Sequence, residues 1–129
     1  MNYQEINGRT LAYLGDATWS LAVRKRLIQE RAGIGMRLQK ETIRFVSAIA
    51  QASFYEFLHQ NGWFTEAEEE VFRRGRNEHT GTLPRHTSSR IYRISTGFEA
   101  ILGMWELQQD MERIEALLDQ VWKLVKEKA

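Results

Sequence analysis

Two carboxylates stand in apolar stretches of this sequence, where an unpaired charge would be costly. Asp16 interrupts the run "LAYLGDATWSLAV" at 11–23, and no residue three or four positions away from it is cationic. Glu99 lies in "GFEAILGMW", and its neighbours at the same helical spacing are also uncharged. A buried, isolated carboxylate is stable only when it is paired or binds a metal. Two such acids brought together from two helices would suit a divalent cation that prefers oxygen ligands, Mg²⁺ or Mn²⁺.

Each acid also has an ordinary structural interpretation. Asp16 could face water on a narrow polar strip of its helix with Arg9 and Ser20. Glu99 could bond to Tyr92 or Arg93 from the preceding turns, because structural ion pairs are common. The occurrence of two acids in matching contexts gives the metal-site interpretation about the same weight as the structural one.

Glycines accompany both acids. Gly15 precedes Asp16 directly, and Gly103 follows Glu99 by four positions. Glycine inside a helix costs about 1 kcal/mol relative to alanine. Each helix accepts that cost beside its acid, which predicts the close approach of another backbone or of a ligand. Tight helix packing alone would explain the pattern equally well.

The elements that would position these residues are all helices. The chain has one proline and no alternating apolar run long enough for a strand, so the sequence predicts an all-α fold. Thr65, with Glu68 three positions later, forms a capping box, and Asp110 is the expected N-cap of the last helix. The predicted helices cover about 8–30, about 37–60, a segment after Thr65, a segment from about Ser89 through Gln109, and a segment after Asp110.

The second predicted helix, 37–60, is expected to be continuous. Phe45, Ile49, Ala52 and Tyr55 are spaced to form one apolar face of it. This pattern predicts that the four side chains are buried together.

Length and composition predict one ordinary globular domain over residues 1–129. The chain has 129 residues, of which 43% are hydrophobic and 27% are charged. It has no apolar run of about 18 residues, which argues against a membrane span, and it has no cysteine, which excludes disulfides. The polar N-terminus lacks the pattern of a secretory signal. Together these features predict a cytoplasmic protein with no membrane partner.

Positive charge is concentrated in one segment, although the net charge is only +1. Six arginines and one acid lie between positions 73 and 93. The preceding "EAEEE" at 66–70 is expected to be a solvated helix start that the helix dipole favours. A local basic surface of this kind can bind a phosphate backbone even when the total charge is near neutral.

Five short motifs resemble those of ribonuclease III endonuclease domains. Their order, in a chain this short and with no double-stranded-RNA-binding domain, narrows the resemblance to the Mini-III ribonuclease family. The first motif is similar to the signature helix of the domain, and the last is similar to its second acidic motif. The resemblance spans about residues 8–107. The motifs are "LAYLGDA" (11–17), "FVSAIAQA" (45–52), "RRGRN" (73–77), "YRISTGFEA" (92–100) and "FEAILG" (98–103).

The resemblance implies an all-α bundle of the ribonuclease III endonuclease type that forms a homodimer and cuts double-stranded RNA with a divalent metal. In bacteria these enzymes mature the ends of large-subunit ribosomal RNA, and their products carry 5′-phosphate and 3′-hydroxyl ends. Asp16 and Glu99 match the catalytic and metal-binding acids of the family, with Mg²⁺ as cofactor and Mn²⁺ as a substitute. The larger ribonuclease III enzymes have further acids at the positions of Ala12 and Thr96, whereas the Mini-III enzymes share the reduced set seen here.

The basic segment is then expected to contact the RNA duplex, since A-form RNA is recognised mainly through its phosphates and 2′-hydroxyls. Trp19 and Trp105 are candidates for core or dimer-interface packing, with the core favoured for both. The residues expected to bind RNA are Arg73, Arg74, Arg76, Asn77, Arg85 and Arg90.

Two departures from the Mini-III pattern leave alternative functions open. Ser20 occupies a position where these enzymes usually have glutamate, and Ile49 occupies one where they usually have lysine. The alternative to an active enzyme is therefore a dimeric module that binds structured RNA but cleaves it poorly. A third possibility is a plain helical interaction domain with coincidental motifs.

Overall fold

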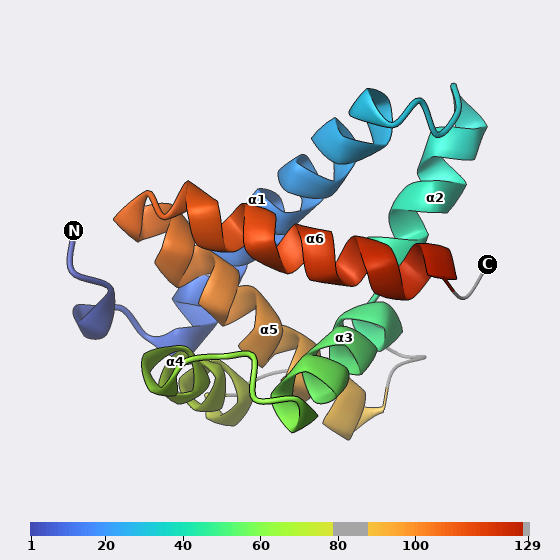
Figure 1. Ribbon diagram of the computed structural model, residues 1–129. Helices are drawn as coiled ribbons and strands as arrows, with labels where there is room; N and C mark the ends of the chain where they lie inside the picture. Colours follow the sequence, from blue (N-terminus) through green and yellow to red (C-terminus); the bar gives the residue numbers. More distant parts are fainter. Residues whose placement is uncertain (79–87, 128–129) are drawn as a thin grey trace.

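The computed structural model describes residues 1–78 and 88–127, and within these ranges it consists of helices alone (Figure 1). The all-α prediction is confirmed. The predicted loop between the third and fourth helices lies mostly in 79–87, outside the described residues. The elements are the 3₁₀ helix η1 (Tyr3–Glu5) and the α-helices α1 (Gly8–Gln29), α2 (Met36–Val46), α3 (Ala48–Gln60), α4 (Glu66–Asn77), α5 (Ser89–Gln108) and α6 (Met111–Glu127).

Helix α5 forms the centre of the molecule. It contacts α1, α3, α4 and α6, and its contact with α1 is the most extensive in the fold. Figure 1 shows α5 passing through the middle of the bundle, while the end of α1 and the start of α2 project away from it. Residues on α5 can therefore meet side chains from most of the other helices.

Glycines allow α1 and α5 to touch backbone to backbone. A Cβ atom on Gly15 would overlap the carbonyl oxygen of Glu99, and one on Gly103 would overlap the carbonyl oxygen of Leu11. The close approach predicted at these two glycines is confirmed, and the partner is another backbone. This contact places Asp16 and Glu99 on adjoining helices at the same level.

The predicted helix over 37–60 is in fact two helices. Ser47 separates α2 from α3 in an extended conformation, with φ −64° and ψ 154°. Its side chain accepts a hydrogen bond from the amide of Ala50 at 3.2 Å, which makes it the N-cap of α3. Because the break changes the phase of the helix, Ile49 is 64% exposed, whereas Phe45 and Tyr55 are buried as expected. The predicted burial of Ile49 was wrong.

The predicted helix starts are otherwise confirmed. Thr65 and Glu68 form the capping box of α4. Asp110 caps α6 by accepting a hydrogen bond from the amide of Arg113 at 3.1 Å. Helix α5 begins at Ser89, as expected, after the N-cap Ser88. None of the described helices is both long enough and apolar enough to cross a membrane.

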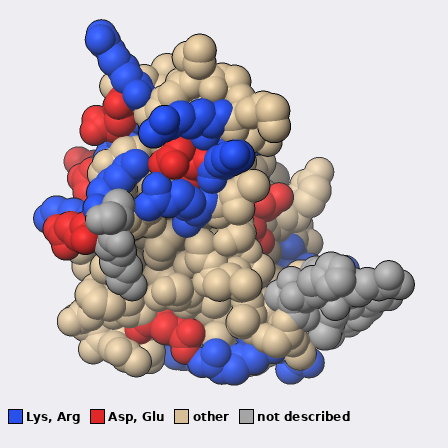
Figure 2. All heavy atoms as spheres, turned by 90° about the vertical axis from the view of Figure 1, so that its right-hand side faces the viewer, with Lys and Arg blue, Asp and Glu red and all other residues tan. Residues whose placement is uncertain are grey.

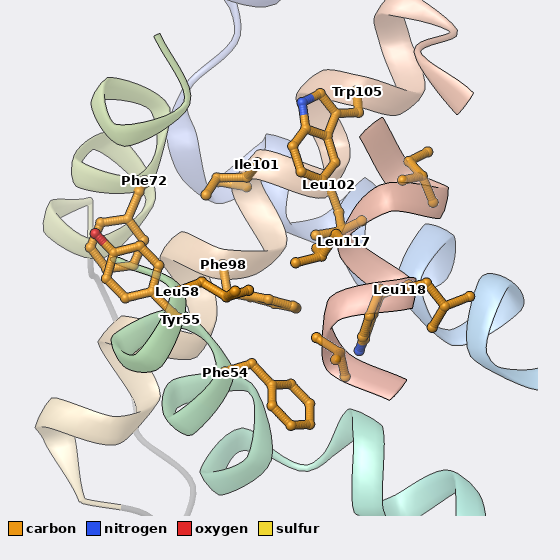
Figure 3. Packing of buried hydrophobic residues seen from close by; sticks show 14 of the residues in the cluster. Phe54, Tyr55, Leu58, Phe72, Phe98, Ile101, Leu102, Trp105, Leu117 and Leu118 are labelled. Atoms are coloured by element: carbon orange, nitrogen blue, oxygen red, sulfur yellow. The ribbon is translucent and has the colours of Figure 1, made fainter. Parts of the chain in front are cut away.

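Aromatic residues fill the core between α1, α3, α4 and α5 (Figure 3). Phe98 is fully buried on α5, and its ring meets that of Trp19 edge to face at 5.3 Å. Trp19 and Trp105 are both buried within this chain, so both belong to the core and not to an exposed interface. The indole of Trp19 donates to the carbonyl oxygen of Phe45 at 2.9 Å, which satisfies its polar group inside the core.

One acid of the "EAEEE" segment is buried, contrary to the expectation of a solvated helix start. Glu68 is only 4% exposed and forms an ion pair with Arg113 of α6 at 2.6 Å. It also accepts a hydrogen bond from the indole of Trp105 at 3.1 Å. These bonds use the carboxylate to join α4, α5 and α6, so Glu68 has a structural role.

Candidate active site and RNA-binding surface

The structure brings Asp16 and Glu99 together at the contact between α1 and α5. The carboxyl of Glu99 lies within hydrogen-bonding reach of the carboxyl of Asp16. The two acids are 83 positions apart in sequence and meet because Gly15 lets the helix backbones touch beside them. Their proximity is what a shared metal site requires.

The two acids differ in exposure. Asp16 is exposed, because it lies on the outer face of α1, next to the 83% exposed Tyr13. The apolar run around Asp16 does not make α1 a fully buried helix: α1 is buried on one face only, and Asp16 faces water. Glu99 is half-buried, and it meets Asp16 and Gln51 there. Together they make a site with one accessible carboxylate and one sheltered carboxylate.

Burial is the largest cause that raises the pKa of Glu99, and together with the hydrogen bond and negative charge of Asp16 it brings this pKa to about 8. A hydrogen bond from Gln51 opposes this shift but does not overcome it. Two adjacent carboxylates share a proton at neutral pH when nothing else neutralises them. In the metal-free protein the two carboxylates therefore repel each other when both are ionised, and a divalent cation would remove this repulsion.

Gln51 is a site residue that the sequence analysis did not single out. It lies on α3 in the "FVSAIAQA" motif and is only 1% exposed. Its side-chain amide donates to Glu99 Oε2 at 3.2 Å and to the carbonyl oxygen of Val46 at 3.3 Å. The available signal was a polar residue in an apolar motif, and the helix break at Ser47 places it beside Glu99.

The donor set of this site fits Mg²⁺ or Mn²⁺. It offers carboxylate oxygens alone, and Mg²⁺ is commonly held by one or two carboxylates, several waters and substrate phosphates. No described group of three or more His, Cys, Asp or Glu residues is arranged to hold a metal. Ala12 and Thr96, one helical turn before the two acids, add no charge to the site. A cation here would need oxygen ligands from water or RNA as well.

Several arginines surround a hollow of about 670 Å³ between α3, α4 and α5. We call it the arginine pocket. Arg73 and Arg93 pair with no carboxylate among the described residues, whereas Arg90 forms an ion pair with Glu56 at the rim. Its lining comprises Tyr55, Glu56, His59, Gln60, Glu69, Phe72, Arg73, Arg76, Asn77, Ser89, Arg90, Arg93 and Ile94.

Glu69, the acid at the floor of the arginine pocket, is occupied by two neighbours. The hydroxyl of Tyr55 donates to Glu69, and His59 Nδ1 lies 2.6 Å from the other carboxylate oxygen. Burial and the bond to Glu69 raise the pKa of the Tyr55 hydroxyl, so that this group stays a neutral donor. Glu69 is therefore engaged by Tyr55 and His59 and pairs with none of the pocket arginines.

The six residues predicted to bind RNA do not all lie together. Arg73, Arg76, Asn77 and Arg90 line the arginine pocket. Arg74 points elsewhere: it is half-buried and donates to the carbonyl oxygen of Ile6, and it does not line this pocket. Arg85 falls in 79–87, outside the described residues. Arg93 lines the pocket although it was not among the predicted residues.

A second basic area lies over α2 and the end of α6. Figure 2 shows Lys and Arg side chains gathered there around Asp or Glu residues. Arg44 and Lys126 both pair with Glu41, at 3.0 and 3.2 Å. Arg44 and Lys126 are thus both paired with a carboxylate, whereas Arg73 and Arg93 of the arginine pocket pair with none among the described residues.

The fold and the paired acids define the class of protein. Residues 9–110 match the family model of the Ribonuclease III domain, so this chain belongs to the ribonuclease III family, whose activity is that of an endoribonuclease. More particularly, its relatives of known name are Mini-ribonuclease 3 proteins, and the chain belongs among them.

These similarities extend over nearly the whole chain. The Mini-ribonuclease 3 of Streptococcus pneumoniae is 38% identical over 113 residues, which are 88% of this chain and 88% of that protein. The Mini-ribonuclease 3 of Symbiobacterium thermophilum is 40% identical over 110 residues, which cover 84% and 82% of the two chains. A crystal structure of a Fusobacterium nucleatum protein superposes with a TM-score of 0.81 at 30% identity, covering 92% of this chain and 95% of that one.

Proposed function

We propose that this protein is a metal-dependent endoribonuclease that cleaves double-stranded RNA, with Asp16 and Glu99 as its metal-binding and catalytic acids. The observation that carries the proposal is the meeting of these two carboxylates at the α1–α5 contact, one exposed and one sheltered. The proposed cofactor is Mg²⁺, for which Mn²⁺ can substitute. The substrate implied by the resemblance to Mini-III ribonucleases is the precursor of large-subunit ribosomal RNA.

The chemistry is phosphodiester hydrolysis. When bound, Mg²⁺ would polarise the scissile phosphate, lower the pKa of the attacking water and neutralise the leaving 3′-oxygen. Glu99 must lose its shared proton to act as a ligand, and its neighbour Asp16 is exposed enough to meet the RNA directly. The water oxygen remains on phosphorus and the 3′-oxygen takes up a proton, which gives 5′-phosphate and 3′-hydroxyl ends.

The arginine pocket supports RNA as the substrate. A-form duplexes present phosphates and 2′-hydroxyls, and an open concave surface lined by several arginines attracts that backbone. Arg73 and Arg93 are the cations best placed for it, because no described carboxylate neutralises them. Asn77 can add hydrogen bonds at the same rim.

A homodimer would place two such sites along one duplex, one for each strand. In support, the outer face of α1 exposes Tyr13 and Leu21, which are 83% and 59% accessible, on either side of Asp16. Ala17, between them, is also exposed. Large apolar side chains on an exposed helix face favour contact with a second surface.

A second candidate function is RNA binding with little cleavage. Ser20, one turn after Asp16, brings no carboxylate to the site, and the exposed Ile49 places an apolar group where lysine is usual in this family. Either change would lower the rate of RNA cleavage more than the stability of the fold. Metal-dependent cleavage separates this alternative from the enzyme.

The test is a cleavage assay with long double-stranded RNA, in Mg²⁺ or Mn²⁺ against EDTA. Asp16→Asn and Glu99→Gln should abolish cleavage, whereas Glu112→Gln, an exposed acid on α6, should cleave at the wild-type rate. RNA that is retarded on a gel but left intact with either metal would favour the binding module. Failure to bind the duplex at moderate salt would overturn both functions.

A further inference from the structure

We propose that Gln51 is a positioning residue that fixes the Glu99 carboxylate for metal binding by holding one of its oxygens. This inference rests on the proposed function, because it concerns the same pair of acids. It assigns to α3 a direct part in a site whose acids come from α1 and α5.

The geometry of Gln51 directs both hydrogens of its amide nitrogen to acceptors. Nε2 donates to Glu99 Oε2 at 3.2 Å and to the carbonyl oxygen of Val46 at 3.3 Å. The side chain is 1% exposed, so water does not compete for these bonds. A carboxylate held at one oxygen by a buried donor has a fixed plane, and its other oxygen is left for a cation.

The helix break at Ser47 explains how the amide acquires a firm anchor. The hydroxyl of Ser47 accepts from the amide of Ala50, which would otherwise have bonded to the carbonyl of Val46 in a continuous helix. The carbonyl of Val46 is therefore available, and Gln51 takes it. The junction between α2 and α3 is thus connected to Glu99 through one side chain.

The chain keeps this amide at an energetic cost. Gln51 Oε1 is buried and has no hydrogen-bond partner among the described residues. A buried polar atom without a partner costs about 1–3 kcal/mol, and such atoms are few in native structures. Core packing alone would be served better by an apolar side chain of the same size.

An amide is also the chemically suitable donor at this position. A lysine or arginine would neutralise Glu99 and compete with the metal, while a third carboxylate would add repulsion to the pair. A neutral amide orients the carboxylate without changing the charge of the site. Within the described residues, the side chains that bond to the Glu99 carboxyl are Gln51 and Asp16.

The test is Gln51→Met, which preserves length and removes both hydrogen bonds. Mn²⁺ binding to the RNA-free protein is measured by electron paramagnetic resonance, and cleavage of double-stranded RNA is measured in parallel. The Kd for Mn²⁺ should rise about tenfold and kcat should fall about tenfold, which is typical of a lost partner behind a metal ligand. The KM for RNA should not change, and the melting temperature should change little, because removal of the orphaned Oε1 is offset by loss of the donor to the Val46 carbonyl.

The matched control is Thr18→Val, which removes another buried hydrogen bond to a carboxylate, that of Glu106 at 3.0 Å. It should leave Mn²⁺ binding and kcat unchanged. If Gln51→Met does not fold, Gln51→Asn keeps the amide but is one methylene too short, and it should show the same losses.

Wild-type Mn²⁺ affinity and kcat in a folded Gln51 variant would overturn the inference, as would equal losses in Thr18→Val. If the wild-type protein itself neither binds Mn²⁺ nor cleaves RNA, the proposed function fails at Asp16 and Glu99, and the role of Gln51 falls with it. The two failures are therefore distinguishable.

Discussion

At the residue scale, the proposed function needs Glu99 in its ionised form, which lowers the stability of the metal-free protein. Its carboxyl is sheltered among α1, α3 and α5 beside a second carboxylate, and its pKa is raised to about 8. In the unfolded chain the same group ionises near its ordinary value of 4.5. Ionising Glu99 in the folded, metal-free protein therefore costs free energy. A bound cation would offset this cost by stabilising the ionised carboxylate.

The pH dependence of stability follows with a definite sign. Between about pH 4.5 and about pH 8 the folded state holds a proton that the unfolded state has lost, so the free energy of unfolding falls as pH rises through this window. Above about pH 8 this contribution levels off. The expected loss for the metal-free protein across this window is at most about 5 kcal/mol, since each pKa unit between 4.5 and about 8 corresponds to about 1.4 kcal/mol.

Glu99→Gln isolates this effect, because the other titrating groups are shared. In EDTA the variant should be more stable than the wild type at about pH 9 and nearly equal at about pH 5, as measured by urea unfolding. It should also be inactive and gain no stability from Mg²⁺. Parallel pH profiles for the two proteins would show that ionised Glu99 is not destabilising.

The arginines give a second prediction at this scale, about RNA affinity. Arg73→Gln with Arg93→Gln should weaken binding to duplex RNA of any sequence, because phosphate contacts carry little sequence information. The slope of log K against log salt should become shallower by about one unit per arginine. Filter binding across a salt series measures both quantities.

The matched control for this double variant is Arg44→Gln. Arg44 is also a surface arginine, but it is paired with Glu41. Its replacement should change the salt slope little, and kcat at saturating RNA should remain near wild type in all of these variants. Equal effects from Arg44 and from the pocket arginines would remove the special role of the pocket.

At the scale of elements, the contact between α1 and α5 creates the site. The acids meet because Gly15 and Gly103 remove the side chains that would keep the two backbones apart. The same helix α5 also supplies Arg90 and Arg93 to the arginine pocket, and α3 supplies Gln51 to one site and Tyr55 to the other. A substrate bound in the pocket is therefore positioned by the same two helices that hold the sheltered acid and its amide.

Gly15→Ala tests the dependence of the site on this contact. In an exposed helix the change would stabilise by about 1 kcal/mol, but here the new methyl would meet the backbone of Glu99. Overpacking of a tight contact should instead destabilise by about 3 kcal/mol, measured by urea unfolding, and should lower cleavage by moving the acids apart. Ala17→Ser, on the exposed face of the same helix, should change stability by less than about 0.5 kcal/mol.

The sequence predicts most elements, and the reasons for its failures are local. Helix starts at Thr65, Ser89 and after Asp110 could be predicted because capping is decided by residues close together in the chain. The break at Ser47 could not be predicted, because the apolar spacing continues across it. A serine within a helical pattern does not by itself indicate an N-cap. Because a continuous helix was predicted over 37–60, neither the exposure of Ile49 nor the contact of Gln51 with Glu99 could be predicted.

The candidate site divides in the same way. The two acids could be chosen from sequence because each stands in an apolar context without a cationic neighbour. Which arginines face the pocket could not be chosen, because adjacent positions on α4 point in different directions. Arg73 lines the pocket, and its neighbour Arg74 bonds to Ile6 near the start of the chain.

At the scale of the whole molecule, the exposed face of α1 makes the homodimer testable. Tyr13 and Leu21 share one stripe of α1 at i and i+8, and Asp16 lies to the side of this stripe, so a second copy that covers the stripe would lie beside the acids and align two sites on one duplex. The wild-type protein should have twice the chain mass by light scattering after size exclusion. Leu21→Glu should shift it toward the monomer, because a charge in an apolar contact between copies is strongly unfavourable.

The control for Leu21→Glu is Ile34→Glu, since Ile34 is even more exposed, at 86%, but lies on the connection between α1 and α2. It should remain dimeric. A monomeric Leu21→Glu protein should still hold Mn²⁺ at Asp16 and Glu99, yet it should nick single strands of a duplex where the dimer cuts both. If Leu21→Glu is as dimeric as the wild type, α1 is not the contact between copies, and the pairing of two cuts on one duplex needs another surface.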